Sequence, residues 1–237
     1  MSDSTAFGDV VSESKTMTDE IVLSLFDYSG NMVKPWAKAG YDCVCVDIKH
    51  EDNEQIVDVG DGSIEYVAAD ITEYLPPRKE YAFVSCFPPC DSLAVSGARW
   101  FQKKGLSALD SGVSNVIAAR EIAQWAEPTY GWMIENPVST LSSYWRDPDY
   151  RFHPYEYDNY TKNDDGYTKK TCLWTSDEFT MPASDTDLTK EDTDSRIHDA
   201  PPSENRKEFR AKTPMGFARA VHQANDEQLN EEPLIVE

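Results

Sequence analysis

The fold class is first indicated by residues 81–90, Tyr81-Ala82-Phe83-Val84-Ser85-Cys86-Phe87-Pro88-Pro89-Cys90, where an apolar run ends at two prolines and a cysteine. Each proline fixes its own φ angle and lacks an N–H donor, so a strand is predicted to leave its sheet just before Cys90. A second apolar run, Tyr130 to Ile134, precedes Glu135-Asn136-Pro137. Because parallel strands collect ligands at their carboxyl ends, we expect Cys90 and Glu135 to face one crevice. For Cys90 alone, a buried cysteine after an ordinary strand is the simpler interpretation.

Apolar runs and helix-like segments alternate along the chain. Strands are expected over Ile21 to Phe26, Cys43 to Val46, Ile64 to Ala68, Tyr81 to Cys86 and Tyr130 to Ile134, and helices over Asn31 to Ala39, Val113 to Ala126 and Gly216 to Asn225. This rhythm predicts an α/β fold with a mostly parallel sheet that helices cover on both faces.

The distribution of polar residues predicts one core domain with polar ends. We expect a flexible acidic tail over residues 1–20, a main domain with the candidate site over 21–175, a loop or small insertion over 176–208, a C-terminal helix that returns to the main domain over 209–226, and an acidic tail over 227–237. The aromatic segment from Tyr150 to Tyr167 fits edge strands and connecting loops better than a surface on which bases stack.

The net charge of −21, from 43 acidic and 22 basic residues, opposes the usual electrostatic footprint of a nucleic-acid-binding protein. This argument against nucleic-acid binding is weaker if the protein works in high salt. Surface carboxylates then help to keep the protein solvated, and the salt screens their charge. The Asp-rich run around Asp185 and Asp199 is consistent with that hypothesis.

The cysteine count and the hydropathy indicate the cellular environment in which the protein is expected to work. An odd cysteine number without repeated spacing argues against a disulfide framework, and no Cys/His set has zinc spacing, so no metal is expected. Cys43 and Cys45 are interpreted as core residues of a strand. No apolar run reaches the length of a membrane helix, and residues 1–20 do not have the pattern of a signal peptide, which predicts a soluble cytoplasmic protein without a membrane partner.

Three predicted strand ends carry groups suited to a nucleotide-like cofactor. Phe26-Asp27-Tyr28-Ser29-Gly30-Asn31 follows the first strand, and Gly30 allows the backbone to approach a ligand. Asp47 ends the second strand, where a carboxylate accepts hydrogen bonds from a ribose, and Asp70 follows the third, within reach of an adenine edge. Each acid alone is more simply a solvated strand terminus.

With these positions assembled, the chain resembles the cytosine carbon-5 DNA methyltransferases, most closely the short phage-type members. The likeness follows the order of that family from Leu25-Phe26 to the segment Arg210-Ala211-Lys212-Thr213-Pro214-Met215-Gly216-Phe217-Ala218, which corresponds to the end segment that returns to the cofactor pocket. Pro88-Pro89-Cys90 and Glu135-Asn136-Pro137 are its specific part. The resemblance implies a Rossmann-like class I methyltransferase fold, S-adenosylmethionine as cofactor, and DNA as substrate.

The resemblance also implies a role for each candidate residue. Cys90 adds as a thiolate to ring carbon 6 of cytosine, Glu135 hydrogen-bonds or protonates the ring edge, and carbon 5 then takes the methyl group. Cofactor contacts are expected from Phe26, Ser29, Gly30, Asp47, Ile48, Asp70, Ile71 and Pro88, and substrate contacts from Pro89, Asn136, Pro137, Ser96 and Arg99. Ser96 to Phe101 is the candidate mobile loop that fills the gap left by an extruded base, with packed loop aromatics as the alternative.

Several departures from the family pattern affect the expected specificity. Tyr28 stands where relatives commonly have a glycine, and Arg206 and Arg210 are the candidates for a substrate-binding arginine motif. The stretch between Trp174 and Lys212 is too short for the target-recognition domain of larger relatives. Target recognition by a protein partner, a single-stranded or mononucleotide substrate, and a catalytically silent cofactor-binding or interaction protein are therefore retained as alternatives.

Overall fold

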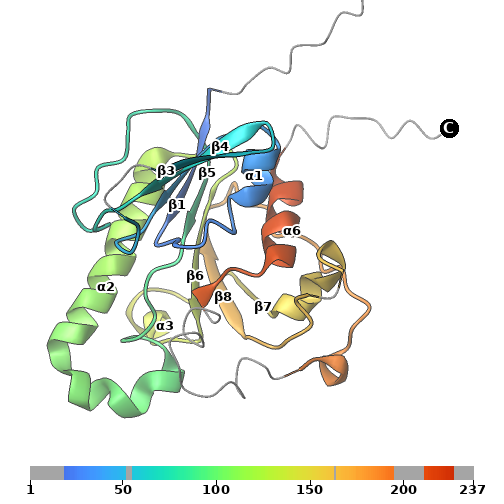
Figure 1. Cartoon of the computed structure of the whole chain (residues 1–237). Coiled ribbons are helices and arrows are strands. Elements are labelled where there is room, and N and C mark those ends of the chain that lie inside the picture. Colours follow the sequence, from blue (N-terminus) through green and yellow to red (C-terminus); the bar gives the residue numbers. More distant parts are fainter. Residues whose placement is uncertain (1–18, 52–54, 163, 195–210, 227–237) are drawn as a thin grey trace, which may run out of the picture.

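The computed structural model describes residues 19–51, 55–162, 164–194 and 211–226. An eight-stranded mixed sheet, ordered β3-β4-β2-β1-β5-β6-β8-β7, forms its centre (Figure 1). The strands are β1 Ile21–Leu25, β2 Asp42–Val46, β3 Gln55–Val59, β4 Gly62–Val67, β5 Tyr81–Cys86, β6 Trp132–Pro137, β7 Tyr150–Phe152 and β8 Thr171–Thr175. The central strands β4, β2, β1, β5 and β6 are parallel to one another, whereas β3, β8 and β7 join the edges through antiparallel pairs.

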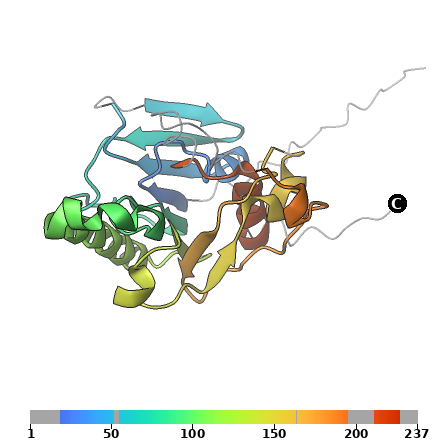
Figure 2. The same cartoon turned by 90° about the horizontal axis from the view of Figure 1, so that it is seen from below.

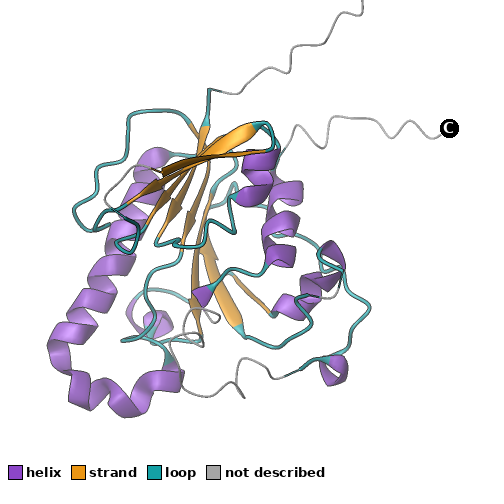
Figure 3. Ribbon diagram, in the orientation of Figure 1, coloured by secondary structure: helices purple, strands orange, loops and turns teal. Residues whose placement is uncertain are grey.

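Helices lie on both faces of this sheet, as Figures 1 and 2 show. The described helices are α1 Lys34–Lys38, α2 Phe101–Ala126, α3 Leu141–Tyr144 and α6 Met215–Asn225, with 3-10 turns η1 Val95–Trp100, η2 Pro154–Tyr160 and η3 Lys190–Asp192. Figure 3 distinguishes these helices from the strands they flank. The predicted α/β class with a largely parallel sheet is therefore confirmed.

The alternation of side chains along each strand divides the core into two layers. In β1, Val22 packs into the cluster that contains α1 and α6 residues, whereas Leu23 packs with the buried residues of α2. Every residue of β1 and β5 is buried, which explains why both read as continuous apolar runs in the sequence. Cys43 and Cys45 are core residues, as predicted.

Several predicted boundaries differ from the observed ones. The first helix begins only at Lys34, because residues 31–33 form a turn, and Pro35 is accommodated in its first turn. The strand predicted over Tyr130 to Ile134 is β6, which extends to Pro137, so Glu135 and Asn136 lie within the strand and not after it. Strand β3 was not predicted; its exposed residues form an antiparallel hairpin with β4.

The long helix α2 begins at Phe101, well before the predicted start at Val113. Gly105, with φ 74° and ψ −173°, interrupts it, in a region of backbone space that only glycine readily occupies. Ser96 to Phe101, expected to be a loop, belongs to η1 and to the first residue of α2. The final helix matches its predicted range within one residue.

The aromatic segment that follows β6 is structural, as the sequence favoured. Phe152 of β7 stacks on Phe217 of α6 with ring centroids 4.0 Å apart, and Tyr157 meets the same ring edge-on at 5.3 Å. This packing holds α6 against the β8–β7 edge of the sheet. Residues 176–194 are loop with one 3-10 turn. None of the helices in the described ranges combines the length and apolar composition that a bilayer crossing requires.

Candidate functional site

The two specific motifs meet at the carboxyl ends of neighbouring strands. Strands β5 and β6 pair in parallel, with Cys86 opposite Ile134. Just beyond this register, the Asn136 side chain donates a hydrogen bond from Nδ2 to the Pro88 carbonyl oxygen at 3.0 Å. Asn136 is fully buried. The amide therefore joins the Pro-Pro-Cys turn directly to the Glu-Asn-Pro strand.

The segment that follows Cys90 is also anchored to the segment after β6. Ala94 forms an isolated antiparallel bridge with Ser139, and the Val95 amide donates to the Val138 carbonyl at 3.0 Å. The Thr140 amide donates to the Leu93 carbonyl at 2.9 Å. These bonds fix the course of the backbone on the carboxyl side of Cys90.

The structure describes all five cysteines, and their burial separates Cys90 from the others. Cys43, Cys45, Cys86 and Cys172 are buried, whereas Cys90 is partly exposed. Burial raises the pKa of the Cys43, Cys45 and Cys86 thiols well above the ordinary cysteine value, because the interior disfavours a thiolate. Accessibility thus leaves Cys90 as the best placed candidate nucleophile.

Glu135 lies opposite a lysine that the sequence analysis did not identify. Its Oε1 is 3.5 Å from the Lys169 Nζ, and the two side chains are only 15% and 17% exposed. Oε1 is buried and has no hydrogen-bond partner among the described residues. The signal for Lys169 was its position two residues before β8, the strand that pairs with β6, but that pairing is not visible in the sequence.

A small pocket surrounds this ion pair. It has a volume of about 10 Å³ and is lined by Phe87, Glu135, Phe152, Lys169, Thr171, Ala211, Thr213, Pro214 and Phe217. Such a volume holds about one water molecule and no aromatic ring. Any larger ligand that contacts Glu135 requires the walls of this pocket to move apart.

The side chains of Glu135 and Asn136 point to opposite faces of the sheet, because successive side chains of a strand alternate. Glu135 shares its pocket with Phe217 of α6, and Met133 belongs to the same layer. Ile134 packs in the α2 layer, on the side to which Asn136 also belongs. Asn136 therefore positions the backbone, and Glu135 carries the functional group toward the α6 side.

The loop after β1 is organised around a buried carboxylate. Asp27 accepts hydrogen bonds from Ser24 Oγ, from the Ser29 amide and hydroxyl, and from the Gly30 amide, at 2.8–3.0 Å. Its burial raises the pKa of Asp27, although these hydrogen bonds oppose the shift. The backbone amides of Ser29 and Gly30, two residues expected to contact a cofactor, thus both donate to Asp27.

Gly30 is required by the fold, for a reason that differs from the prediction. It has φ 63°, and a Cβ atom at this position would lie 2.7 Å from the Tyr66 hydroxyl oxygen. The space beside Gly30 therefore belongs to Tyr66 and not to an open crevice. Phe26, at φ 57°, is a second left-handed residue in this loop, and Tyr28 stacks on His50 with centroids 5.4 Å apart.

Asp47 and Asp70 lie after β2 and β4, as predicted, and each closes a local turn. Asp47 Oδ1 accepts the Lys49 amide at 2.8 Å, and Asp70 Oδ1 accepts both the amide and the hydroxyl of Thr72. Those bonds lower the pKa of Asp70. The second oxygen of each carboxylate takes no part in its turn.

The remaining predicted site residues have different surroundings. Ile48 is 70% exposed, whereas Ile71 is buried in the core, so its side chain is not available to a cofactor. Pro88 is buried and Pro89 is exposed. Ser96 and Arg99 are exposed on η1, and Pro137 ends β6.

The C-terminal segment lies against the loop after β1. Asn31 Nδ2 donates to the Thr213 carbonyl at 3.1 Å, and the Gly216 amide donates to Asp165 Oδ2 at 2.6 Å. Thr213 and Phe217 thereby form one wall of the pocket around Glu135. Arg206 and Arg210, the candidate substrate arginines, lie outside the described residues.

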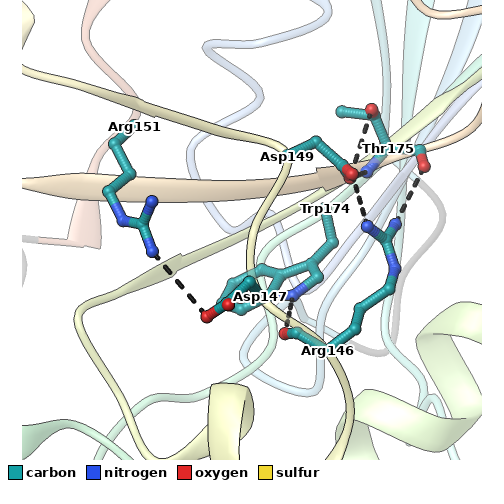
Figure 4. Close-up of polar contacts among 6 residues, drawn as sticks. All are labelled: Arg146, Asp147, Asp149, Arg151, Trp174 and Thr175. Carbon is teal, nitrogen blue, oxygen red and sulfur yellow. Dashed lines mark hydrogen bonds and ion pairs between the residues drawn. The ribbon is translucent and has the colours of Figure 1, made fainter.

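A polar network braces the far end of β8 (Figure 4). Arg146 forms an ion pair with Asp149 at 2.5 Å and donates to the Thr175 carbonyl at 3.0 Å, while Trp174 Nε1 donates to the Arg146 carbonyl at 2.8 Å. Asp149 Oδ2 accepts the Thr175 amide at 2.8 Å. This network fixes the strand that begins just after Lys169.

No protein-family model matches this chain, and a search of curated proteins gives no significant match.

Proposed function

We propose that this protein is an S-adenosylmethionine-dependent methyltransferase of the Rossmann-like class I fold that modifies cytosine at carbon 5 in DNA. One observation carries the proposal: the hydrogen bond from Asn136 to the Pro88 carbonyl, which joins the two motifs at adjacent parallel strand ends. A thiol-bearing turn and a carboxylate-bearing strand held together in this way suit covalent catalysis on a ring.

The proposed reaction assigns a bond change to each residue. The Cys90 thiolate donates an electron pair to carbon 6 of cytosine, the ring nitrogen takes up a proton from water, and the Glu135 carboxylate accepts a hydrogen bond from the exocyclic amine. The added electron density makes carbon 5 nucleophilic. After methyl transfer, with S-adenosylhomocysteine as the leaving group, loss of the carbon-5 proton to a base restores the double bond between carbons 5 and 6 and expels Cys90 as a thiolate, and the ring nitrogen returns its proton to water.

Lys169 has a supporting role in this proposal. Its ammonium lies beside Glu135 in a pocket with few other polar groups, so it compensates the carboxylate charge before a substrate arrives. The Glu135 oxygen without a hydrogen-bond partner suits the exocyclic amine of a cytosine, which is a donor.

S-adenosylmethionine, when bound, supplies the electrophilic methyl group. Asp47 and Asp70 suit its nucleoside part, because each keeps one carboxylate oxygen outside its own turn. The Ser29 and Gly30 amides do not suit its carboxylate in this conformation, because Asp27 already accepts both. The exposed side chains of Tyr28 and Ile48 border the same strand ends.

A second candidate substrate, a single strand or a free cytosine nucleotide, is favoured by the charge. A net charge of −21 repels an extended duplex, whereas a short or flexible substrate brings fewer phosphates to the surface. A duplex would also have to release the target base from its stack, at a cost of a few kcal/mol.

One experiment tests the reaction and its substrate together. Purified protein is incubated with methyl-labelled S-adenosylmethionine and, in parallel, duplex DNA, single-stranded DNA, RNA and dCMP, at low and at molar salt, and the nucleosides are then identified. We expect label on carbon 5 of cytosine, lost in Cys90→Ala and retained in Cys172→Ala, the buried-cysteine control. Label on an exocyclic amine, or full activity in Cys90→Ala, would contradict the proposal.

A further inference from the structure

Residues 92–109, which we call the basic segment, reverse the charge of the chain. They contain Arg99, Lys103 and Lys104, which are three of its 22 basic residues, and none of its 43 acidic residues. The segment spans η1 and the first turns of α2. A local positive surface on so acidic a protein indicates a polyanionic partner at this place.

An exposed indole lies among these cations. Trp100 is 48% exposed, with the Arg99 guanidinium carbon 5.3 Å and the Lys103 Nζ 5.8 Å from its ring centroid. Both basic side chains are exposed as well. Cation–π contact keeps the charges beside the ring, so a flat stacking surface and two phosphate-binding groups are presented together.

The basic segment is connected to the candidate nucleophile. Lys104 Nζ donates to the Asp91 carbonyl at 2.5 Å, and Asp91 directly follows Cys90. Gly105 then redirects the chain, and a Cβ atom there would meet nothing within 4 Å. The first turn of α2 is therefore held against the Cys90 turn and is open to solvent on its other side.

We propose that the basic segment docks a single-stranded nucleic acid, with one base stacked on Trp100 and neighbouring phosphates bound by Arg99 and Lys103. The inference rests on the proposed function, since it places the strand beside Cys90. A single strand fits better than a duplex, because only unstacked bases offer a face to an indole, and because the charge elsewhere repels an extended duplex.

The chain contains a matched control surface at the opposite end of the sheet. Trp125 is 51% exposed and borders a shallow pocket together with Arg78 and Lys79. Arg78 and Lys79 precede β5, and Trp125 lies at the end of α2. Trp100, in contrast, comes after β5. The control residues place an exposed indole beside two cations, with Glu80 in the same pocket, and without the connection to Cys90.

The test measures binding without methyl transfer, using full-length Cys90→Ala protein and fluorescence anisotropy of a short labelled single strand containing one cytosine. Trp100→Ala is expected to weaken binding of the strand about tenfold. Trp100→Phe should keep most of the original affinity, because phenylalanine also offers a ring on which a base stacks. Arg99→Gln with Lys103→Gln should reduce the slope of log affinity against log salt by about 1.4. Trp125→Ala, and Arg78→Gln with Lys79→Gln, should change neither quantity, and circular dichroism checks folding of each variant.

Three results would overturn the docking surface: equal losses from the Trp100 and Trp125 variants, tighter binding of the matching duplex, or Trp100-dependent binding to anionic lipid vesicles without binding to the strand. Trp100-dependent strand binding in a protein that transfers no methyl group would refute the proposed chemistry and retain the surface. Methyl transfer that is unaffected by Trp100→Ala would refute the docking surface and retain the proposed chemistry.

Discussion

The ammonium of Lys169 lies 3.5 Å from Oε1 of Glu135, and both side chains are mostly withdrawn from water. A charged pair in this position contributes little net stability, but removal of one partner leaves the other charge without compensation. Substitution of either residue alone is therefore expected to destabilise the candidate site.

Lys169→Met is expected to destabilise the protein by about 1–3 kcal/mol, because Glu135 then keeps its charge without a cation. Adding Glu135→Gln should recover most of that loss, because neither charge remains. Urea unfolding of both single variants and the double variant measures the coupling. Additive effects of the two substitutions would show that the ion pair has no role in stability.

Asn136→Ala is expected to cost about 1–3 kcal/mol, since the buried Pro88 carbonyl loses its donor. The proposed methyl transfer should fall as well, because the Cys90 turn is then less firmly held to β6. Asn159→Ala is the control: its amide donates to Asp185 Oδ1 at 2.9 Å on the exposed surface, so its loss should cost much less. Equal costs in the two variants would contradict the proposed anchoring role.

Gly30→Ala is expected to be destabilising for two separable reasons, a left-handed φ angle and a clash with the Tyr66 hydroxyl. The backbone contributes about 1–2 kcal/mol, and the clash adds about 1–3 kcal/mol. Tyr66→Phe removes the nearest atom and should relieve part of the second cost. Thermal unfolding of the single and double variants separates the two costs. Gly97→Ala is the control, because a Cβ atom there would lie 3.7 Å from the Asp91 carbonyl oxygen, an ordinary contact distance.

The buried Asp27 predicts a pH dependence of definite sign. Its folded-state pKa is raised by burial, so its contribution to stability is full below the unfolded pKa of about 3.9 and is lost as the pH rises through the folded value. The stability advantage of wild type over Asp27→Asn should therefore shrink from pH 4 upward, measured by urea unfolding. Asp70→Asn should show the opposite trend, because hydrogen bonds lower the pKa of Asp70.

The net charge of −21 predicts that salt stabilises the fold. Repulsion among surface carboxylates extends over a screening length of about 10 Å at 0.1 M salt and about 3 Å at 1 M. The unfolding temperature should therefore rise between those two salt concentrations. A neutral osmolyte of equal osmolarity is the control, because it changes the solvent without screening charges. An unfolding temperature independent of salt would count against adaptation to high salt.

The sequence predicted the features that depend on local patterns. Apolar runs located β1, β2, β5 and β6, because parallel strands buried on both faces read continuously apolar. The two prolines located the end of β5, and the strand rhythm predicted that the motifs of Cys90 and Glu135 would lie at neighbouring strand ends, where Asn136 bonds to the Pro88 carbonyl. The domain boundaries and the roles of the site residues remain predictions.

The features that depend on long-range packing could not be predicted. Lys169 reaches Glu135 only because β8 enters the sheet antiparallel to β6, and no local pattern sets that pairing. Gly30 was assigned to a ligand because the position of Tyr66 was unknown. The start of α2 was placed too late, because Gly105 interrupts the helical pattern and separates its first turn from the rest.

The bond between Asn31 and the Thr213 carbonyl can form only late in the synthesis of this chain. The two residues are 182 positions apart, which corresponds to a delay of roughly 10–35 seconds at about 5–20 residues per second. Until Thr213 emerges, the nascent chain lacks both this bond and one wall of the Glu135 pocket. A chain interrupted before that point would contain the residues of every described strand but would lack α6 and one wall of the pocket around Glu135.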